Sequence, residues 1–211
     1  RYAFPKLAPH LSETEAAAHP AESVIKLTLD RHLQQNLERL AREHARTIGD
    51  NVSTAIVVAD HQTGEILAEV GSADYLDAAR HGAVDMATAV RSPGSTLKPF
   101  VYGLAFEAGL AHPATLIEDR PVRFGTYAPK NFDDGYHGTV SIREALEQSL
   151  NVPAVRVLAR VGPGKLAGRF RRAGVTARFP DKSEPTLAMA LGGTGLTLEE
   201  LTQLYAGLAR G

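Results

Sequence analysis

The chain has 211 residues, of which 44% are apolar and 22% charged, a balance typical of one globular domain with its own core. The formal net charge of −1 argues against a general attraction to nucleic acid or to an anionic membrane surface. Cysteine is absent, which excludes disulfides, thiol catalysis and thiolate metal sites and leaves the redox compartment open.

The first 22 residues contain Pro5, Pro9 and Pro20 and show no sustained periodicity, so we interpret residues 1–22 as a linker or lead-in. The chain opens with Arg1 rather than Met, without a signal segment, and we expect it to be an excised fragment. No apolar run is long enough to span a bilayer. Any membrane anchoring is therefore expected only through segments outside this chain.

The next segments predict a strand, a helix and a hairpin. Residues 23–29 alternate loosely and indicate a strand, after which Asp30 can cap a helix that continues to about His44. Residues 52–59 are apolar and β-branched, and a Thr-Gly turn separates them from a partner strand at residues 66–70.

The remainder is mainly helical in pattern. A helix is predicted from Ser95 to Ala108, and residues 112–140 form a long irregular segment of the kind that often carries function. Further helical patterns are grouped towards the C-terminus, at about 141–149, 152–160, 163–173 and 197–210. Thr197 with Glu200 forms the sequence pattern of a capping box for the last helix.

Ser-x-x-Lys, the spacing of a serine nucleophile and its base, occurs twice. Ser23 and Lys26 lie in a strand pattern, where a three-residue spacing sends the side chains to opposite faces, and we interpret that copy as chance. Ser95 and Lys98 lie at a helix start, where the same spacing places them on one face. A buried lysine with a lowered pKa can accept the serine proton, and the Ser95 N–H can donate to an oxyanion. The alternative is a capping serine followed by a solvated lysine.

Ser149-x-Asn151 is the second candidate element. It lies at a junction between two helical patterns, where Pro153 requires a new helix start. A hydroxyl and an amide at such a junction can shuttle protons or hold a substrate amide. Taken alone, the pair fits a helix cap better than a catalytic element.

In order along the chain, several motifs resemble the transpeptidase domain of bifunctional (class A) penicillin-binding proteins. Ser-x-x-Lys together with a Ser-x-Asn element belongs to the known signature of penicillin-binding proteins and class A β-lactamases. The segments that carry the resemblance are Thr28-Leu29-Asp30 with Leu33-Gln34, Ala55-Ile56-Val57-Val58, Thr63-Gly64-Glu65-Ile66-Leu67-Ala68, Ser92-Pro93-Gly94-Ser95-Thr96-Leu97-Lys98-Pro99-Phe100, Pro129-Lys130-Asn131-Phe132, Gly138-Thr139-Val140 and Ala145-Leu146 leading into Ser149-Leu150-Asn151.

The resemblance implies an α/β fold, the β-lactamase and penicillin-binding transpeptidase-like sheet flanked by helices, for residues 23–211. It implies a peptidoglycan D,D-transpeptidase that uses Ser95 as nucleophile, Lys98 as base, and Ser149 and Asn151 as assisting groups. Asn131 and Tyr136, on the long irregular segment, are the candidate substrate-binding residues. The implied partners are peptidoglycan stem peptides and β-lactams, with no nucleic acid, no cofactor and no metal, in a periplasmic location.

One motif of the family does not occur in this sequence. Lys-Thr-Gly is absent, whereas in the family it lies on a strand beyond a segment that resembles Ala190-Leu191-Gly192-Gly193. We therefore expect the C-terminal strands of the domain to be missing from this chain. The missing strand would supply the second oxyanion donor, so that the activity of the fragment alone is open.

Two alternatives remain. A β-lactamase would share the acylation step but needs a base for deacylation, and the run from Glu147 to Asn151 that spells Glu-x-x-Leu-Asn overlaps the Ser-x-Asn element, so we interpret it as accidental. A catalytically silent wall-binding or scaffold module of the same fold is the other alternative, against which the four candidate catalytic residues argue together. Zinc hydrolysis is disfavoured because the eight His residues are scattered.

Overall fold

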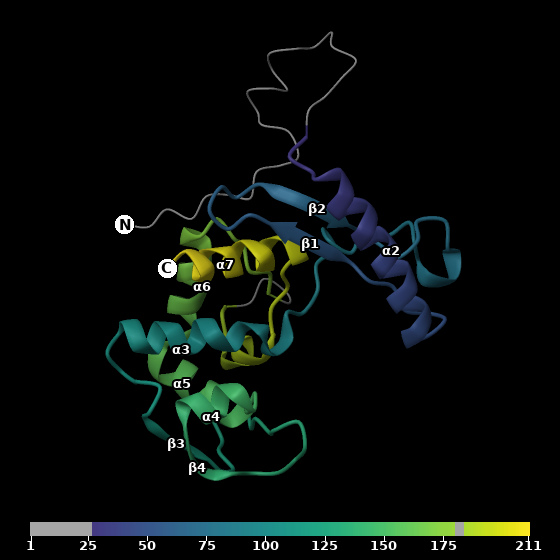
Figure 1. Cartoon of the computed structure of the whole chain (residues 1–211). Helices are drawn as coiled ribbons and strands as arrows, with labels where there is room; N and C mark the ends of the chain where they lie inside the picture. Colours follow the sequence, from purple (N-terminus) through teal and green to yellow (C-terminus); the bar gives the residue numbers. More distant parts are fainter. Residues whose placement is uncertain (1–26, 180–183) are drawn as a thin grey trace. The chain divides into compact units, whose positions relative to one another are not determined.

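The computed structural model describes residues 27–179 and 184–211 (Figure 1). It divides into two compact units. The first takes the chain up to Arg91 and also includes Arg172–Thr176 and Leu196–Gly211, and the second comprises Ser92–Arg171 and Ala177–Gly195. Of the sequence predictions, the linker at 1–22 and the Ser23/Lys26 pair lie outside the described residues.

The first unit contains a hairpin and two helices. Strands β1 (Ile56–Ala59) and β2 (Ile66–Val70) pair antiparallel, with Ile56 opposite Val70, as the sequence predicted. Helix α2 (Arg31–Ile48) packs beside β2, and helix α7 (Leu198–Arg210) packs beside β1 (Figure 1). Alternate residues of β2 are buried, as expected of a strand with one covered face. The predicted strand at 23–29 is not formed over its described part, residues 27–29.

Capping explains where the two helices begin. The Asp30 carboxylate accepts from the Leu33 N–H at 2.8 Å and starts α2. Thr197 and Glu200 form the predicted capping box, in which each side chain accepts from the other's backbone N–H, and they start α7. Both helix starts were predicted from the sequence, and α2 continues four residues beyond the expected end.

A buried arginine ends α2. The short 3₁₀ helix Ala78–Arg80 carries Arg80, whose guanidinium donates to the carbonyl oxygens of Ala45, Gly49 and Val52 at 2.6–2.9 Å and pairs with Asp77. The last carbonyls of a helix have no partner within the helix. Arg80 therefore donates to the last turn of α2 at Ala45 and to the loop after it at Gly49 and Val52, and it ties both to the segment that follows β2.

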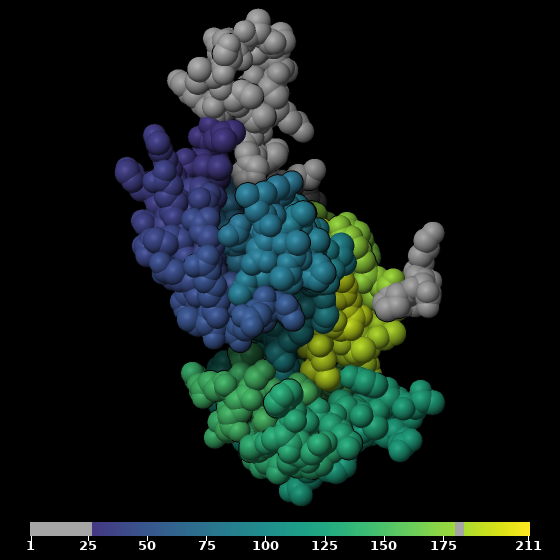
Figure 2. Space-filling model, turned by 90° about the vertical axis from the view of Figure 1, so that its right-hand side faces the viewer, coloured from purple at the N-terminus to yellow at the C-terminus, as the bar shows by residue number. Residues whose placement is uncertain are grey.

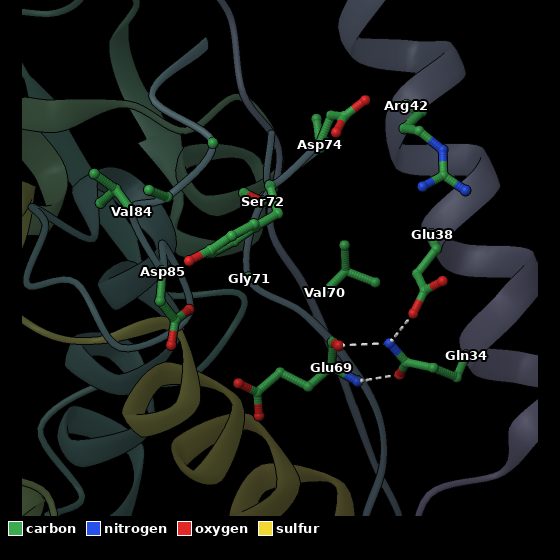
Figure 3. Close-up of a pocket in the computed structure, with 14 residues that line it drawn as sticks. Gln34, Glu38, Arg42, Glu69, Val70, Gly71, Ser72, Asp74, Val84 and Asp85 are labelled. Atoms are coloured by element: carbon green, nitrogen blue, oxygen red, sulfur yellow. Dashed lines mark hydrogen bonds between the residues drawn. The ribbon is translucent and has the colours of Figure 1, made fainter. Parts of the chain in front are cut away.

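The outer edge of β2 is closed by a side chain of α2. The Gln34 amide accepts from the Glu69 N–H and donates to the Glu69 carbonyl, both at 2.8 Å, which reproduces a strand-pairing contact (Figure 3). Beside it lies a cavity of about 300 Å³, lined by α2, the end of β2 and the segment that follows it. On the surface, α2 and that following segment lie side by side (Figure 2).

The second unit is built around helix α5 (Asn151–Val161). Helix α3 (Lys98–Glu107), the 3₁₀ helix η4 (Leu187–Leu191) and strand β3 (Leu116–Asp119) all pack on α5. Seven of its eleven residues are buried: Val152, Pro153, Ala154, Val155, Val157, Leu158 and Val161. The unit also contains the 3₁₀ helix η2 (Gly94–Leu97), strand β4 (Gly138–Ser141), helix α4 (Ile142–Glu147) and all but the last residue of helix α6 (Pro163–Arg172).

Strands β3 and β4 were not predicted from the sequence. They pair antiparallel, with Leu116 opposite Ser141, and lie inside the segment that was expected to be irregular. Each has only four residues, and Leu116 is 69% exposed, so that little apolar alternation marks them. The pair brings the two ends of residues 120–137 together beside α4 and α5 (Figure 1).

Candidate active site

The Ser95–Lys98 pair spans a change of helix type. Ser95 lies in the 3₁₀ helix η2 (Gly94–Leu97), and Lys98 is the first residue of α3. A 3₁₀ helix has three residues per turn, so that side chains three apart are aligned along it. Ser95 is exposed, whereas Lys98 is 0% exposed. The sequence prediction of a helix start at this point is confirmed, with a first turn that is tighter than an α-helix.

Two glycines make the turn before Ser95 possible. Gly94 has φ +56°, a conformation that favours glycine. Gly192 has φ +87°, and a Cβ built on it would lie 2.3 Å from the Gly94 nitrogen. The Gly192 carbonyl accepts from the Ser92 hydroxyl at 2.7 Å. The backbone after η4 is therefore in direct contact with the turn before Ser95. A side chain at Gly192 would collide with this turn, whereas one at Gly94 would meet no atom but would strain the backbone.

The Lys98 ammonium has three acceptors. Its Nζ donates to the Ser149 carbonyl oxygen at 2.5 Å, to Ser149 Oγ at 3.0 Å and to Asn151 Oδ1 at 2.8 Å. These match the three donors of an ammonium group. Burial lowers the pKa of Lys98 from its ordinary value to about 8, because the charged form loses hydration. An appreciable fraction of Lys98 is thus neutral near physiological pH, as a proton acceptor requires.

Ser149 occupies a conformation that serine rarely adopts. It has φ +54°, and it follows α4 at the position where helices commonly place a glycine. Its N–H donates to the Leu146 carbonyl at 3.0 Å, and the next N–H, of Leu150, donates to the Ala145 carbonyl at 2.8 Å. This is the pattern of a Schellman motif. A serine held in the left-handed region is strained, and such strain is often found at functional positions.

Asn151 is held by a neighbouring loop. Its Nδ2 donates to the Lys130 carbonyl at 2.8 Å, which leaves Oδ1 to accept from Lys98. Its backbone N–H, one of the unpaired groups at the start of α5, donates to Asn131 Oδ1 at 2.8 Å. The side-chain amide is therefore fixed on its Nδ2 side by Lys130 and on its Oδ1 side by Lys98. The backbone N–H is held by Asn131.

The two candidate substrate-binding residues lie in different environments. Asn131 is 5% exposed, and its amide bonds to Asp119, Gly135, Asn151 and Val152. Tyr136 is 38% exposed on the same segment. Substrate contact by either residue stays a prediction. The geometry of Asn131 supports a role in holding the start of α5.

Two parts of this arrangement were missed by the sequence prediction. Asp119, at the end of β3, is 0% exposed and bonds to Asn131. Gly192 packs against the turn before Ser95. The Gly192-Gly193 dipeptide is a signal for a close backbone approach. The sequence around Asp119 gives no sign of its role, because its partner Asn131 lies twelve residues later in a segment without periodicity.

The family of the chain follows from comparison with known proteins. Residues 54–211 match the family described as penicillin binding protein transpeptidase domain. The chain belongs to this family. Its helices and sheets accordingly belong to a β-lactamase-like fold, as the sequence predicted.

Individual relatives agree with this assignment. The chain is 44% identical to penicillin-binding protein 1C of Escherichia coli over 98% of its own length and 27% of that protein. It is 34% identical to penicillin-binding protein 1F of Bacillus subtilis over 80% of the chain and 23% of that protein. The lead-in Arg1-Tyr2-Ala3-Phe4-Pro5 also resembles penicillin-binding protein 1C. The chain thus spans about a quarter of the length of these curated relatives.

Solved structures support the same fold. A crystal structure of penicillin-binding protein 1A from Haemophilus influenzae matches 74% of the chain and 23% of its own, with a TM-score of 0.63 and 29% identity. PonA1 from Mycobacterium tuberculosis in complex with penicillin V matches 88% of the chain and 51% of its own, with a TM-score of 0.69. At 24% identity, the latter shows the fold alone.

Other site types receive no support from the described part of the chain. Within residues 27–179 and 184–211, no group of three or more His, Asp or Glu side chains is placed to hold a metal ion. No helix in these ranges combines the length and the apolar character needed to cross a membrane. The cavity beside Gln34 and Glu69 is lined by none of Ser95, Lys98, Ser149 and Asn151 (Figure 3).

Proposed function

We propose that this chain carries the acylation machinery of a peptidoglycan D,D-transpeptidase. The observation that supports it most strongly is the buried Lys98, which lies three residues after Ser95, has a lowered pKa and contacts Ser149 and Asn151. Membership of the penicillin-binding transpeptidase family supports peptidoglycan synthesis as the process.

In the first step, neutral Lys98 takes the proton of Ser95 Oγ while Oγ attacks the carbonyl carbon of a terminal D-Ala-D-Ala bond. The developing oxyanion accepts from the Ser95 N–H at the start of η2, where the first N–H groups of a helix are unpaired. The C–N bond then breaks, and D-Ala leaves with a proton delivered from Lys98 through the Ser149 hydroxyl, which contacts Lys98 Nζ. The product is an ester of Ser95.

In the second step, the amine of a neighbouring stem peptide attacks this ester. The amine proton passes back through Ser149 and Lys98 to Ser95 Oγ, a new amide bond forms and the Ser95 ester breaks. Asn151 keeps the Lys98 side chain in place through both steps. A β-lactam would acylate Ser95 by the first step alone. On this account the protein works on the periplasmic side of the inner membrane, where its polymeric substrate is found.

The test uses the full-length protein that contains this chain, with Ser95→Ala as the matched control. A fluorescent penicillin should label the wild type and not the variant, and the wild type should convert pentapeptide-bearing glycan into cross-linked product with release of D-Ala. A labelled protein that releases its acyl group within seconds to water would instead be a β-lactamase. Absence of any Ser95-dependent labelling would leave the silent wall-binding module as the explanation.

A further inference from the structure

A buried carboxylate lies three contacts away from Lys98. Asp119, at the end of β3, is 0% exposed and contacts neither Lys98 nor Ser95 through a described hydrogen bond. Its Oδ1 and Oδ2 each accept from Asn131 Nδ2 at 2.9 Å, and Oδ2 also accepts from the His137 N–H at 2.8 Å. A carboxylate this deeply buried is costly unless its oxygens are satisfied, and these donors satisfy both.

The carboxylate helps to determine which way the Asn131 amide faces, together with the Gly135 carbonyl, which accepts from the same Nδ2 at 2.9 Å. An ionised carboxylate only accepts hydrogen bonds, so the NH₂ end of Asn131 must face Asp119. The carbonyl end must then face the start of α5, where it accepts from the N–H groups of Asn151 at 2.8 Å and Val152 at 3.3 Å. The reversed amide would put its oxygen against the carboxylate and its NH₂ group against two N–H donors.

The start of α5 in turn positions Asn151 against Lys98. Leu150, the residue before the helix, caps it with no side-chain hydrogen bond, so Asn131 supplies the cap from a distant segment. The same segment holds the Asn151 side chain through the Lys130 carbonyl. Asn151 Oδ1 then accepts from Lys98 Nζ. The contacts thus run without a break from Asp119 through Asn131 and Asn151 to Lys98, within one compact unit.

We propose that Asp119 is a positioning residue for Ser95 acylation, which acts by fixing the Asn131 amide and, through it, the contact between Asn151 and Lys98. The proposal rests on the function proposed above. It assigns the buried end of β3 a role in catalysis, although that strand touches no reacting group. Asp119→Asn removes the charge and keeps the shape, but places an NH₂ group against the NH₂ of Asn131.

The experiment measures the second-order rate constant and the end point of fluorescent-penicillin labelling on the full-length protein. Asp119→Asn should label to the same end point as the wild type, because the folded site survives, but about 10- to 100-fold more slowly, as expected for loss of a hydrogen bond to a charged group. A merely structural role would lower the end point and leave the rate constant of the folded fraction unchanged.

Two matched variants control for the change of charge and for disturbance of the core. Glu118→Gln makes the same chemical change one residue earlier, on an exposed side chain that pairs with Arg120 and Thr139. Tyr102→Phe removes a buried hydroxyl close to Asp119. This hydroxyl has no hydrogen-bond partner among the described residues. Both variants should label at the wild-type rate.

A double-mutant cycle tests the route. If Asp119 acts through Asn151, then Asp119→Asn should slow labelling less than about twofold in an Asn151→Ala background, because the shared contact is already lost. An equal slowing in both backgrounds, or a wild-type rate for Asp119→Asn, would overturn the proposal. Asp119→Ser is a second variant, to be used if the Asp119→Asn protein does not fold. A wild type that does not label at Ser95 would refute the proposed function instead.

Discussion

The strained conformation of Ser149 can be tested by two substitutions that differ only in the backbone freedom they allow. Ser149→Gly and Ser149→Ala both remove the hydroxyl that accepts from Lys98, so this loss cancels in their comparison. A residue with a Cβ pays about 1–2 kcal/mol in the left-handed region, whereas glycine does not. Glycine loses about 0.5–1 kcal/mol through its more flexible unfolded chain. The Gly variant should therefore be more stable than the Ala variant by about 0.5–1 kcal/mol.

The assay is chemical unfolding of the full-length protein carrying each variant. The free energy of unfolding is taken from the transition in which this domain unfolds. Gly103 provides the opposite case, because it lies inside α3 and a Cβ there meets no atom within 4 Å. Gly103→Ala should stabilise the protein by about 0.5–1 kcal/mol. Both Ser149 variants should label poorly with penicillin. An Ala variant at position 149 that is as stable as the Gly variant would refute the claim of strain.

Three further predictions concern Lys98, the turn before Ser95 and the end of α2. The rate constant of acylation should rise about tenfold per pH unit below the Lys98 pKa of about 8 and level off above it, because only neutral Lys98 accepts the proton. Lys98→Arg should abolish acylation at every pH, because arginine stays charged. Gly192→Ala should slow acylation and lower the free energy of unfolding by about 2 kcal/mol or more, because the added Cβ would collide with Gly94. An unchanged acylation rate would contradict this contact. Arg80→Leu should lower the free energy of unfolding by about 2–4 kcal/mol, because the carbonyls of Ala45, Gly49 and Val52 lose this donor. A decrease of less than about 0.5 kcal/mol would count against that role.

Local signals account for most of the fold that could be predicted. Asp30 and the Thr197–Glu200 pair mark helix starts through their own side chains, and the β1–β2 hairpin carries a β-branched run and a Thr-Gly turn. The β3–β4 pair lacks such signals because its strands are short and partly exposed. Its existence depends on packing against α4 and α5, which no local pattern encodes.

The site divides in the same way. Ser95 and Lys98 could be predicted because residues three apart at a helix start lie on the same face of the helix. The meeting of Lys98 with Ser149 and Asn151 was expected only by resemblance, because these residues lie about 50 positions apart. The strain at Ser149 could not be predicted at all, since serine gives no sequence signal for a left-handed backbone.

The central claim, that Ser95 is the nucleophile, is tested most directly by locating the acyl group after reaction with a penicillin. Trypsin should release the segment from Ser92 to Arg123 as one peptide, because prolines follow Lys98 and Arg120 and block cleavage there. The account predicts a mass increase of one penicillin on this peptide, fragment ions that place it on Ser95, and no adduct in Ser95→Ala. An adduct on any other residue, or one that persists in Ser95→Ala, would contradict the account.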